Sequence, residues 1–196
     1  MYRTSELRFT KVTETVPDLT PARIAKLSTE KRVDIDSRIE ILQAMAGYKW
    51  VGEAAHVISS SKPNAATQEQ ELACQLLNNM GLAYQFDWIE RPGRYFSWIQ
   101  FAINASMLDM FMDKENPFTV VEQGAVYGYP VSSTLAYAGV IPARREDKKS
   151  VANAFLSGVN SEAYYEREVE YAEKIWGYLR QLAPELIKEA EEDYKK

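Results

Sequence analysis

The chain has 196 residues, of which 46% are hydrophobic, and this fits one globular domain and excludes a disordered segment. Its net charge is −5, and residues 161–196, with ten acidic and six basic side chains, carry −4 of it. The remainder is close to neutral, which argues against a general nucleic-acid binder and against electrostatic attachment to a membrane.

The cysteine content and the N-terminus indicate a compartment. A single cysteine, Cys74, excludes a disulfide within the chain and fits a reducing environment. Residues 1–6 have no apolar signal region, and no stretch approaches ~18 apolar residues. We therefore expect a cytoplasmic protein without a transmembrane helix.

The N-terminal segment is expected to be extended. Apolar residues alternate imperfectly along 7–16, so residues 1–19 predict an extended arm or an edge strand. Thr20 followed by Pro21 is a typical helix start, because threonine caps a helix and proline suits its first position. A short helix should follow.

Helical patterns continue from there to Gly81. Asp36 and Ser37 are expected to cap a helix that Gly47 interrupts and that residues 50–58 continue in helical register. A polar loop follows. Residues 67–80 predict a further helix, with threonine at its start and Gly81 as a left-handed C-cap.

The strongest local signal is a β-hairpin within 82–103. Two apolar runs, 82–89 and 95–103, alternate their side chains as strands do. Pro92 and Gly93 between them suit a type II turn, since glycine tolerates the positive φ of its third position. A hairpin alone is marginal, so its aromatic side chains must pack on helices or further strands.

The second half of the sequence is predicted to be helical. Thr119 and Glu122 form a capping-box pattern, and residues 128–130, Gly-Tyr-Pro, predict a tight corner that leads into the next helix. Apolar residues recur at alternating spacings of four and three across 165–190, the longest helical pattern, which Pro184 should kink or split.

These patterns together predict a helix-dominated α+β fold with a small antiparallel sheet and a long C-terminal helix. One domain is expected to span 1–196. Its last residues, 189–196, should be a solvated acidic tail.

The element order around the corner resembles a known family. Residues 128–133 read Gly-Tyr-Pro-Val-Ser-Ser. An uncharacterised prokaryotic domain, frequent in archaea and known only as a domain of unknown function, is similar across 82–186, but its corner reads Gly-Phe/Tyr-Pro-x-Cys-Cys. Ser132 and Ser133 stand where that family has its cysteines, and no Cys or His follows Cys74. Because serine is a poor ligand for soft metals, the resemblance implies a member without thiol or metal chemistry.

Few side chains suggest a reaction. Glu53 and His56 form a Glu-x-x-His pattern on the expected helix, but with one histidine the chain alone cannot complete a di-iron or zinc site. Cys74 would have His56 as its sole histidine base, so a buried small residue is the simpler interpretation. No catalytic residue and no metal ligand is predicted.

Two surfaces are candidates for binding. The corner predicts a ligand pocket whose lining is listed here: Glu122, Tyr127, Tyr129, Ser132 and Ser133. Serines at a helix start can hold an anion, although capping is their commoner role. In the hairpin, Arg91 and Arg94 lie beside aromatic residues, a combination that nucleic-acid binders use but that a solvated turn also explains.

The usual catalytic signatures are missing, since no P-loop, Rossmann glycine pattern, nucleophile elbow or metal cluster occurs. We therefore expect a non-catalytic interaction or binding protein, without cofactor, that binds a protein partner or a second copy of the chain. The alternative is a small-molecule-binding domain or enzyme with its pocket at the corner. Nucleic-acid binding through the hairpin ranks third because the chain has no basic footprint.

Overall fold

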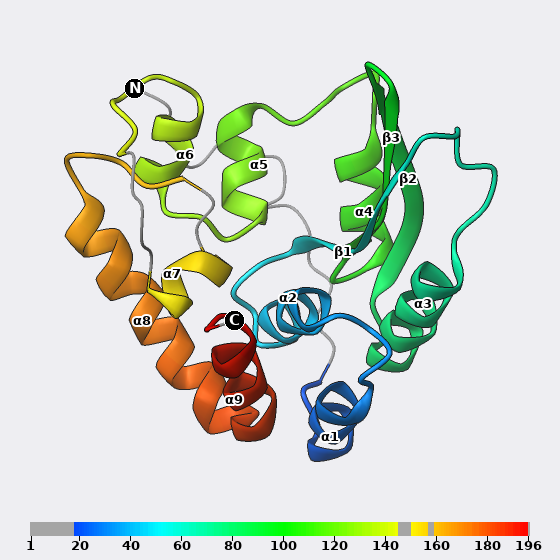
Figure 1. Cartoon of the computed structure of the whole chain (residues 1–196). Coiled ribbons are helices and arrows are strands. Elements are labelled where there is room, and N and C mark those ends of the chain that lie inside the picture. Colours follow the sequence, from blue (N-terminus) through cyan, green and yellow to red (C-terminus); the bar gives the residue numbers. More distant parts are fainter. Residues whose placement is uncertain (1–17, 145–149, 157–158, 196) are drawn as a thin grey trace. The chain divides into compact units, whose positions relative to one another are not determined.

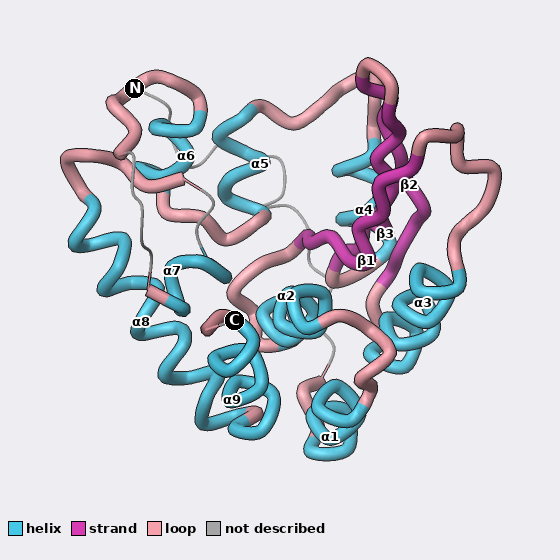
Figure 2. The backbone as a smooth tube through the Cα atoms, in the orientation of Figure 1, coloured by secondary structure: helices cyan, strands magenta, loops and turns pink. Residues whose placement is uncertain are grey.

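A computed structural model describes residues 18–144, 150–156 and 159–195 of the chain. The described residues divide into two compact units, one within 18–112 and the other from 113 onward. Figures 1 and 2 show helices throughout and one small sheet, which belongs to the first of these units. The predicted fold class, a helix-dominated α+β fold with a small antiparallel sheet and a C-terminal helical segment, is confirmed. The predicted arm lies almost wholly outside the described residues.

The sheet-containing unit has four helices and three strands in its described part. They are α1 (Pro21–Thr29), α2 (Ile35–Met45), β1 (Val51–Ser59), α3 (Gln68–Met80), β2 (Ala83–Arg91), β3 (Arg94–Ala102) and α4 (Ala105–Met112). The strands are antiparallel in the order β1-β3-β2, so β3 is central and the other two form the edges.

Local caps account for the helix boundaries in this unit. Thr20 caps α1, and Thr67 with Gln70 forms a capping box at α3, as the hydroxyl and amide chemistry predicts. Gly81 ends α3 at φ +75°. The N-cap of α2, however, is Asp34 and not the predicted Asp36, because the Asp34 carboxylate accepts the main-chain N–H of Ser37 at 2.8 Å.

The predicted hairpin is confirmed as β2 and β3. Arg91 and Arg94 are the last paired residues, and Gly93 between them has φ +75°, as a type II turn requires. Toward its other end β3 enters the core, where Ile99 and Phe101 are fully buried. Helix α3 contacts all three strands, and Figure 1 shows α3 and α4 on either side of the sheet.

The prediction of a helix over residues 50–58 was wrong, because this segment is strand β1. It pairs with β3 from Val51 to Ser59, with an irregularity between Ala54 and Val57. The extra residue shifts the strand's alternation by one position, so apolar side chains before and after it no longer follow a period of two. That shift makes the segment resemble a helix when it is read in isolation.

The other unit is helical in its described part. It contains α5 (Val120–Val126), α6 (Val131–Tyr137), α7 (Val151–Leu156), α8 (Tyr165–Leu182) and α9 (Pro184–Asp193). The capping box of α5 and the positive φ of Gly128, +75°, confirm the sequence expectations. The sequence patterns did not predict α7, which follows the charged segment 145–149 outside the described residues.

The long C-terminal pattern is split at Pro184 into α8 and α9, as predicted. Trp176 is buried and its ring stacks on that of Phe155 in α7, with centroids 5.2 Å apart. In the predicted acidic tail, Ala190 is buried, and Glu191 accepts hydrogen bonds from the indole of Trp176 and from Arg180. Helix α9 therefore reaches into the tail, and exposed residues follow from 192.

Candidate functional site

At the predicted corner, Glu122 serves the helix start. Its carboxylate Oε2 accepts the main-chain N–H and the hydroxyl of Thr119, both at 2.9 Å, and Thr119 Oγ1 accepts the N–H of Glu122 at 3.3 Å. The side chain is buried. These contacts complete the capping box, so a ligand would have to share Glu122 with the start of α5.

The remaining corner residues differ in how they are held. The rings of Tyr127 and Tyr129 stack with centroids 5.9 Å apart, and both side chains are half-buried. Ser132 is half-buried, whereas Ser133 is buried and its hydroxyl has no hydrogen-bond partner among the residues that the structure describes. The corner thus brings the two tyrosines together on the loop that leads into α6, and ligand binding there stays a prediction.

A close helix contact that the sequence patterns did not identify lies beside the corner. A β-carbon on Gly124 of α5 would lie 2.1 Å from Oγ1 of Thr134 in α6. Glycine at this position lets the two short helices pack closely. The signal in the sequence, one glycine inside a helical pattern, does not reveal its packing partner.

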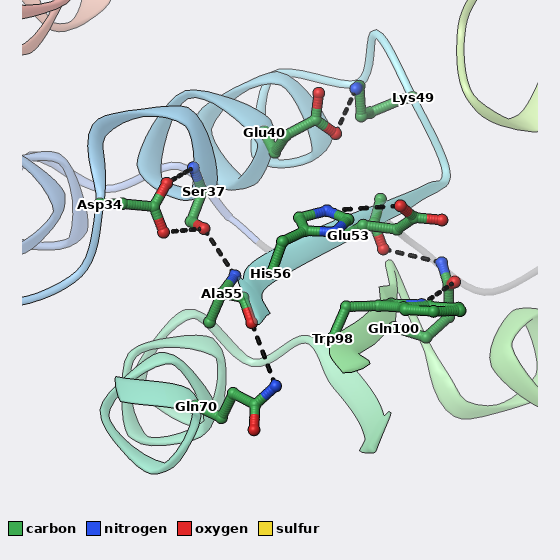
Figure 3. A network of polar contacts seen from close by, with 11 residues as sticks. Asp34, Ser37, Glu40, Lys49, Glu53, Ala55, His56, Gln70, Trp98 and Gln100 are labelled. Atoms are coloured by element: carbon green, nitrogen blue, oxygen red, sulfur yellow. Dashed lines mark hydrogen bonds and ion pairs between the residues drawn. The ribbon is translucent and has the colours of Figure 1, made fainter. Parts of the chain in front are cut away.

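The Glu53–His56 pair lies on β1 and not on the expected helix, yet the two side chains meet. In a regular strand, residues three apart point to opposite faces. Here Ala55 and His56 both lie opposite Trp98, so the bulge returns His56 to the face of Glu53. His56 Nε2 is 3.4 Å from Glu53 Oε2, and its ring stacks on that of Trp98 (Figure 3).

This cluster has the chemistry of an exposed pair. The His56 side chain is 60% exposed, and no nucleophile is found bonded to it among the described residues. Cys74 is half-buried on α3, where burial and then the charge of Glu71 raise the pKa of its thiol. A raised pKa leaves less thiolate, which is the reactive form.

The bulge in β1 is locked by side chains from two helices. Ala55 has φ +51°, a left-handed conformation that is rare for a residue with a β-carbon. Its N–H donates to Ser37 Oγ of α2 at 2.8 Å, and its carbonyl accepts from Gln70 Nε2 of α3 at 3.2 Å (Figure 3). The Ser37 hydroxyl in turn donates to Asp34 at 2.5 Å. Both main-chain groups of the bulged residue are therefore already bonded.

Helix α2 also contacts the residues around the start of β1. Lys49, which is buried, pairs with Glu40 of α2 at 2.5 Å. Gly52 lies so close to the core that an added β-carbon would be 2.4 Å from the ring of Phe101 and 3.0 Å from Glu40. With a bulge in its middle and a helix at its start, β1 is a poor edge for another strand.

The opposite edge, β2, is built differently. The main-chain hydrogen bonds of β3 show which of its residues bond toward β1 and which bond toward β2. Ile103 N donates to Trp50 O at 2.9 Å, so Ile103 and every second residue before it bond toward β1. The residues between them, such as Gln100, bond toward β2, where Gln85 is the partner. The main-chain groups of Gln85, and of every second residue of β2 counted from it, therefore bond to β3.

The intervening residues of β2 point their main-chain groups away from the sheet. The outward main-chain groups of Tyr84 and Phe86 have no hydrogen-bond partner in the described part of the chain. Trp88 is partly protected, because its N–H donates to Oδ1 of Asp87 at 2.9 Å. The strand pairs with β3 without interruption over its 9 residues. Within residues 18–112, then, β2 has an open edge.

The residues of β2 do little to guard this edge. The strand contains neither lysine nor proline, which commonly protect an edge strand, and its charged residues are Asp87, Glu90 and Arg91. The residues whose main chain faces outward are Tyr84, Phe86, Trp88 and Glu90, and three of the four are aromatic. Sequence reasoning recognised the alternation but not its meaning, because only the pairing order shows that β2 is an edge.

No group of three or more His, Cys, Asp or Glu side chains that could hold a metal ion is present among the described residues. None of the helices described has the length and apolarity to cross a membrane.

Comparison with known proteins gives no relative. No protein-family model, no curated protein and no solved structure matches the chain. The resemblance to the archaeal domain therefore stays a prediction, and function must be argued from the geometry alone.

Proposed function

We propose that the chain is a non-catalytic protein-binding module that pairs with an extended segment along the free edge of β2. The observation that carries this proposal is the asymmetry of the sheet. The edge at β1 is broken at Ala55 and bonded to two helices, whereas the edge at β2 is continuous and its outward main-chain groups at Tyr84 and Phe86 are unbonded in the described chain.

The physical basis is strand addition. An added strand bonds to the outward N–H and C=O groups of an edge, and its alternate side chains pack beside those of the edge strand. On β2 these neighbours are half-buried Phe86 and Trp88 and exposed Tyr84. Cross-strand contacts with aromatic residues contribute about 0.2–1 kcal/mol each, so this edge offers side-chain contacts as well as main-chain bonds.

Site-specific photo-crosslinking tests the proposal with a matched pair of isoleucines. Ile89 on β2 is 39% exposed and Ile58 on β1 is 59% exposed. A photoreactive residue at either position is introduced in the cells that naturally make the chain. We expect protein adducts from position 89 and few from position 58, although the latter side chain is the more exposed.

The control is Tyr84→Pro. Proline lacks an N–H, and that of Tyr84 points outward, so the substitution blocks an incoming strand and spares the bonds to β3. We expect it to remove the adducts from position 89. Equal adducts from both positions, or adducts that persist in the proline variant, would contradict binding at the β2 edge. The adduct mass distinguishes a second copy from another protein.

The corner is a second candidate, as a small-molecule site. It is favoured by the Ser133 hydroxyl, which is buried without a hydrogen-bond partner in the described part of the chain. Removing an unsatisfied buried hydroxyl is nearly neutral or stabilising. If a ligand uses this hydroxyl, Ser133→Ala raises the melting temperature of the free protein but abolishes the thermal shift that a ligand from a metabolite panel causes. An equal shift in both proteins excludes this role.

We also propose a cytoplasmic location, since a single half-buried cysteine needs no oxidising compartment. Fractionation of the cells that make the chain tests this, and recovery with secreted material would contradict it.

A further inference from the structure

We infer that the strand which adds to β2 is β2 of a second copy of the chain, so that two three-stranded sheets become one continuous antiparallel sheet about a two-fold axis at Phe86. This inference rests on the proposed function, because it names the partner at the same edge. A two-fold interface uses the same patch on both subunits and must therefore be self-complementary. The sequence of β2 can be tested for that property one register at a time.

Only some registers are allowed. Outward-facing residues must lie opposite outward-facing residues of the partner, since these exchange both main-chain hydrogen bonds. With the axis at Phe86, this residue lies opposite its own copy, and Tyr84 lies opposite Trp88. The strands then overlap from Ala83 to Ile89. Every outward pair in this overlap is aromatic, one of the classes of cross-strand pair that stabilise sheets.

The neighbouring registers are less favourable. With the axis at Asp87, the strands overlap along their whole length, but two carboxylates lie directly opposite at about 4.5 Å between Cα atoms, which is destabilising. With the axis at Gln85, the overlap shrinks to 83–87. With the axis at Trp88, Phe86 lies opposite Glu90, and one aromatic pair is left.

Pairing with the axis at Phe86 also provides a new acceptor for the Trp88 N–H. The Trp88 N–H now bonded to Asp87 would turn to the carbonyl of Tyr84 in the other copy. The released Asp87 carboxylate then lies opposite Gln85 of the other copy, whose carboxamide N–H can donate to it. The hydrogen bond between Asp87 and the Trp88 N–H is thus replaced and not simply lost.

Disulfide formation between single-cysteine variants tests the register. In a Cys74→Ala background, Gln85→Cys and Asp87→Cys proteins are prepared separately and then mixed under mild oxidation. With the axis at Phe86, positions 85 and 87 of different copies lie opposite each other within bonding range. Like positions are about 7–8 Å apart, too far for a disulfide. We expect disulfide-linked dimers in the mixture only, at least tenfold above either variant alone.

Each other outcome overturns the inference. Linkage of Asp87→Cys alone would place the axis at Asp87, and linkage of Gln85→Cys alone would place it at Gln85. Absence of linkage, with a monomeric mass by light scattering for the unmodified chain at high concentration, would exclude the second copy. In that case photo-adducts of other masses at position 89 would still support the proposed function, so the two failures are distinguishable. Circular dichroism confirms that each variant is folded.

Discussion

The two edges of the sheet belong to the same unit and have the same length, yet they treat their outward main-chain groups in opposite ways. Strand β1 bends at Ala55, and the hydroxyl of Ser37 and the carboxamide of Gln70 bond both groups of that residue. Strand β2 stays regular, and among the described residues its outward main-chain groups make one side-chain hydrogen bond, from the Trp88 N–H to Asp87. Blocking an edge with a bulge and buried side chains is costly, because Ala55 must adopt an unfavourable conformation.

The contrast between the two edges indicates where another strand is excluded and where it is accepted. A long regular edge invites pairing, and proteins that must stay alone usually interrupt it. This chain interrupts β1 and leaves β2 uninterrupted. We interpret the contrast as a division of roles, in which β1 fixes the unit's own packing and β2 receives the partner.

The largest expected effect is on the packed edge. Gly52→Ala places a β-carbon 2.4 Å from the buried ring of Phe101, so we expect a loss of about 3 kcal/mol in the free energy of unfolding. Gly177→Ala, where nothing lies within 4 Å, is the control and should gain about 1 kcal/mol from helix propensity. Urea denaturation measures both. Equal effects would mean that β1 is not tightly packed.

The second prediction separates the two sides of β2. Gln85→Pro removes an N–H that bonds to β3, so we expect a loss of about 2 kcal/mol in the free energy of unfolding. Tyr84→Pro removes an outward N–H and should cost less than half as much. Thermal unfolding followed by circular dichroism gives the comparison. If Tyr84→Pro were the more damaging, the assigned hydrogen-bond phase of β2 would be wrong.

A third prediction concerns the hydrogen bonds that hold the bulge at Ala55. Ser37→Ala leaves the buried Ala55 N–H without its acceptor and removes a hydrogen bond to half-buried Asp34, which should cost about 1–2 kcal/mol. Ala55→Gly should instead be neutral or stabilising by up to about 1 kcal/mol, because glycine adopts a positive φ without strain. Calorimetry measures both variants. A strongly destabilising glycine would show that Ala55 is not strained.

The smallest expected effect comes from the loop between α1 and α2, which leads to the Asp34–Ser37 lock. Hydrogen bonds from Arg32, at 2.8 and 3.0 Å, lower the pKa of Glu30 from 4.5 to about 2. Because the folded pKa is the lower one, the pair stabilises the protein fully above about pH 4.5, and this contribution disappears as the pH falls through about 2.

Glu30→Gln should therefore lower the unfolding free energy by less than about 1 kcal/mol at pH 7, since Arg32 is largely exposed. The difference between the two proteins should shrink toward pH 2. Urea denaturation across this range checks it, and a difference that does not change with pH would contradict the role of the pair.

Sequence patterns were sufficient where structure is decided locally. The caps at Thr20, Thr67 and Thr119, the turn at Gly93 and the break at Pro184 all depend on neighbours within a few residues. Such signals are properties of the local chain, and the structure confirmed them.

The misses have non-local causes. Strand β1 exists because it pairs with β3, some forty residues later, and the bulge at Ala55 disguises its alternation. The open edge at β2 was invisible for the same reason, since a strand becomes an edge only when the order of the sheet is known. The cap of α2 at Asp34 was misplaced because Asp36 offers the same chemistry two residues later.

In the chain without a partner, the outward main-chain groups of β2 should be free until a partner strand adds. Residue-resolved amide hydrogen exchange by NMR, at a concentration where light scattering shows a monomer, tests it most directly. We predict fast exchange at Tyr84 and Phe86, and slow exchange at Gln85, Asp87 and Ala55, with protection of Tyr84 and Phe86 appearing as the concentration rises. Uniformly slow exchange along β2 in the monomer would contradict the claim, because the edge would then already be covered.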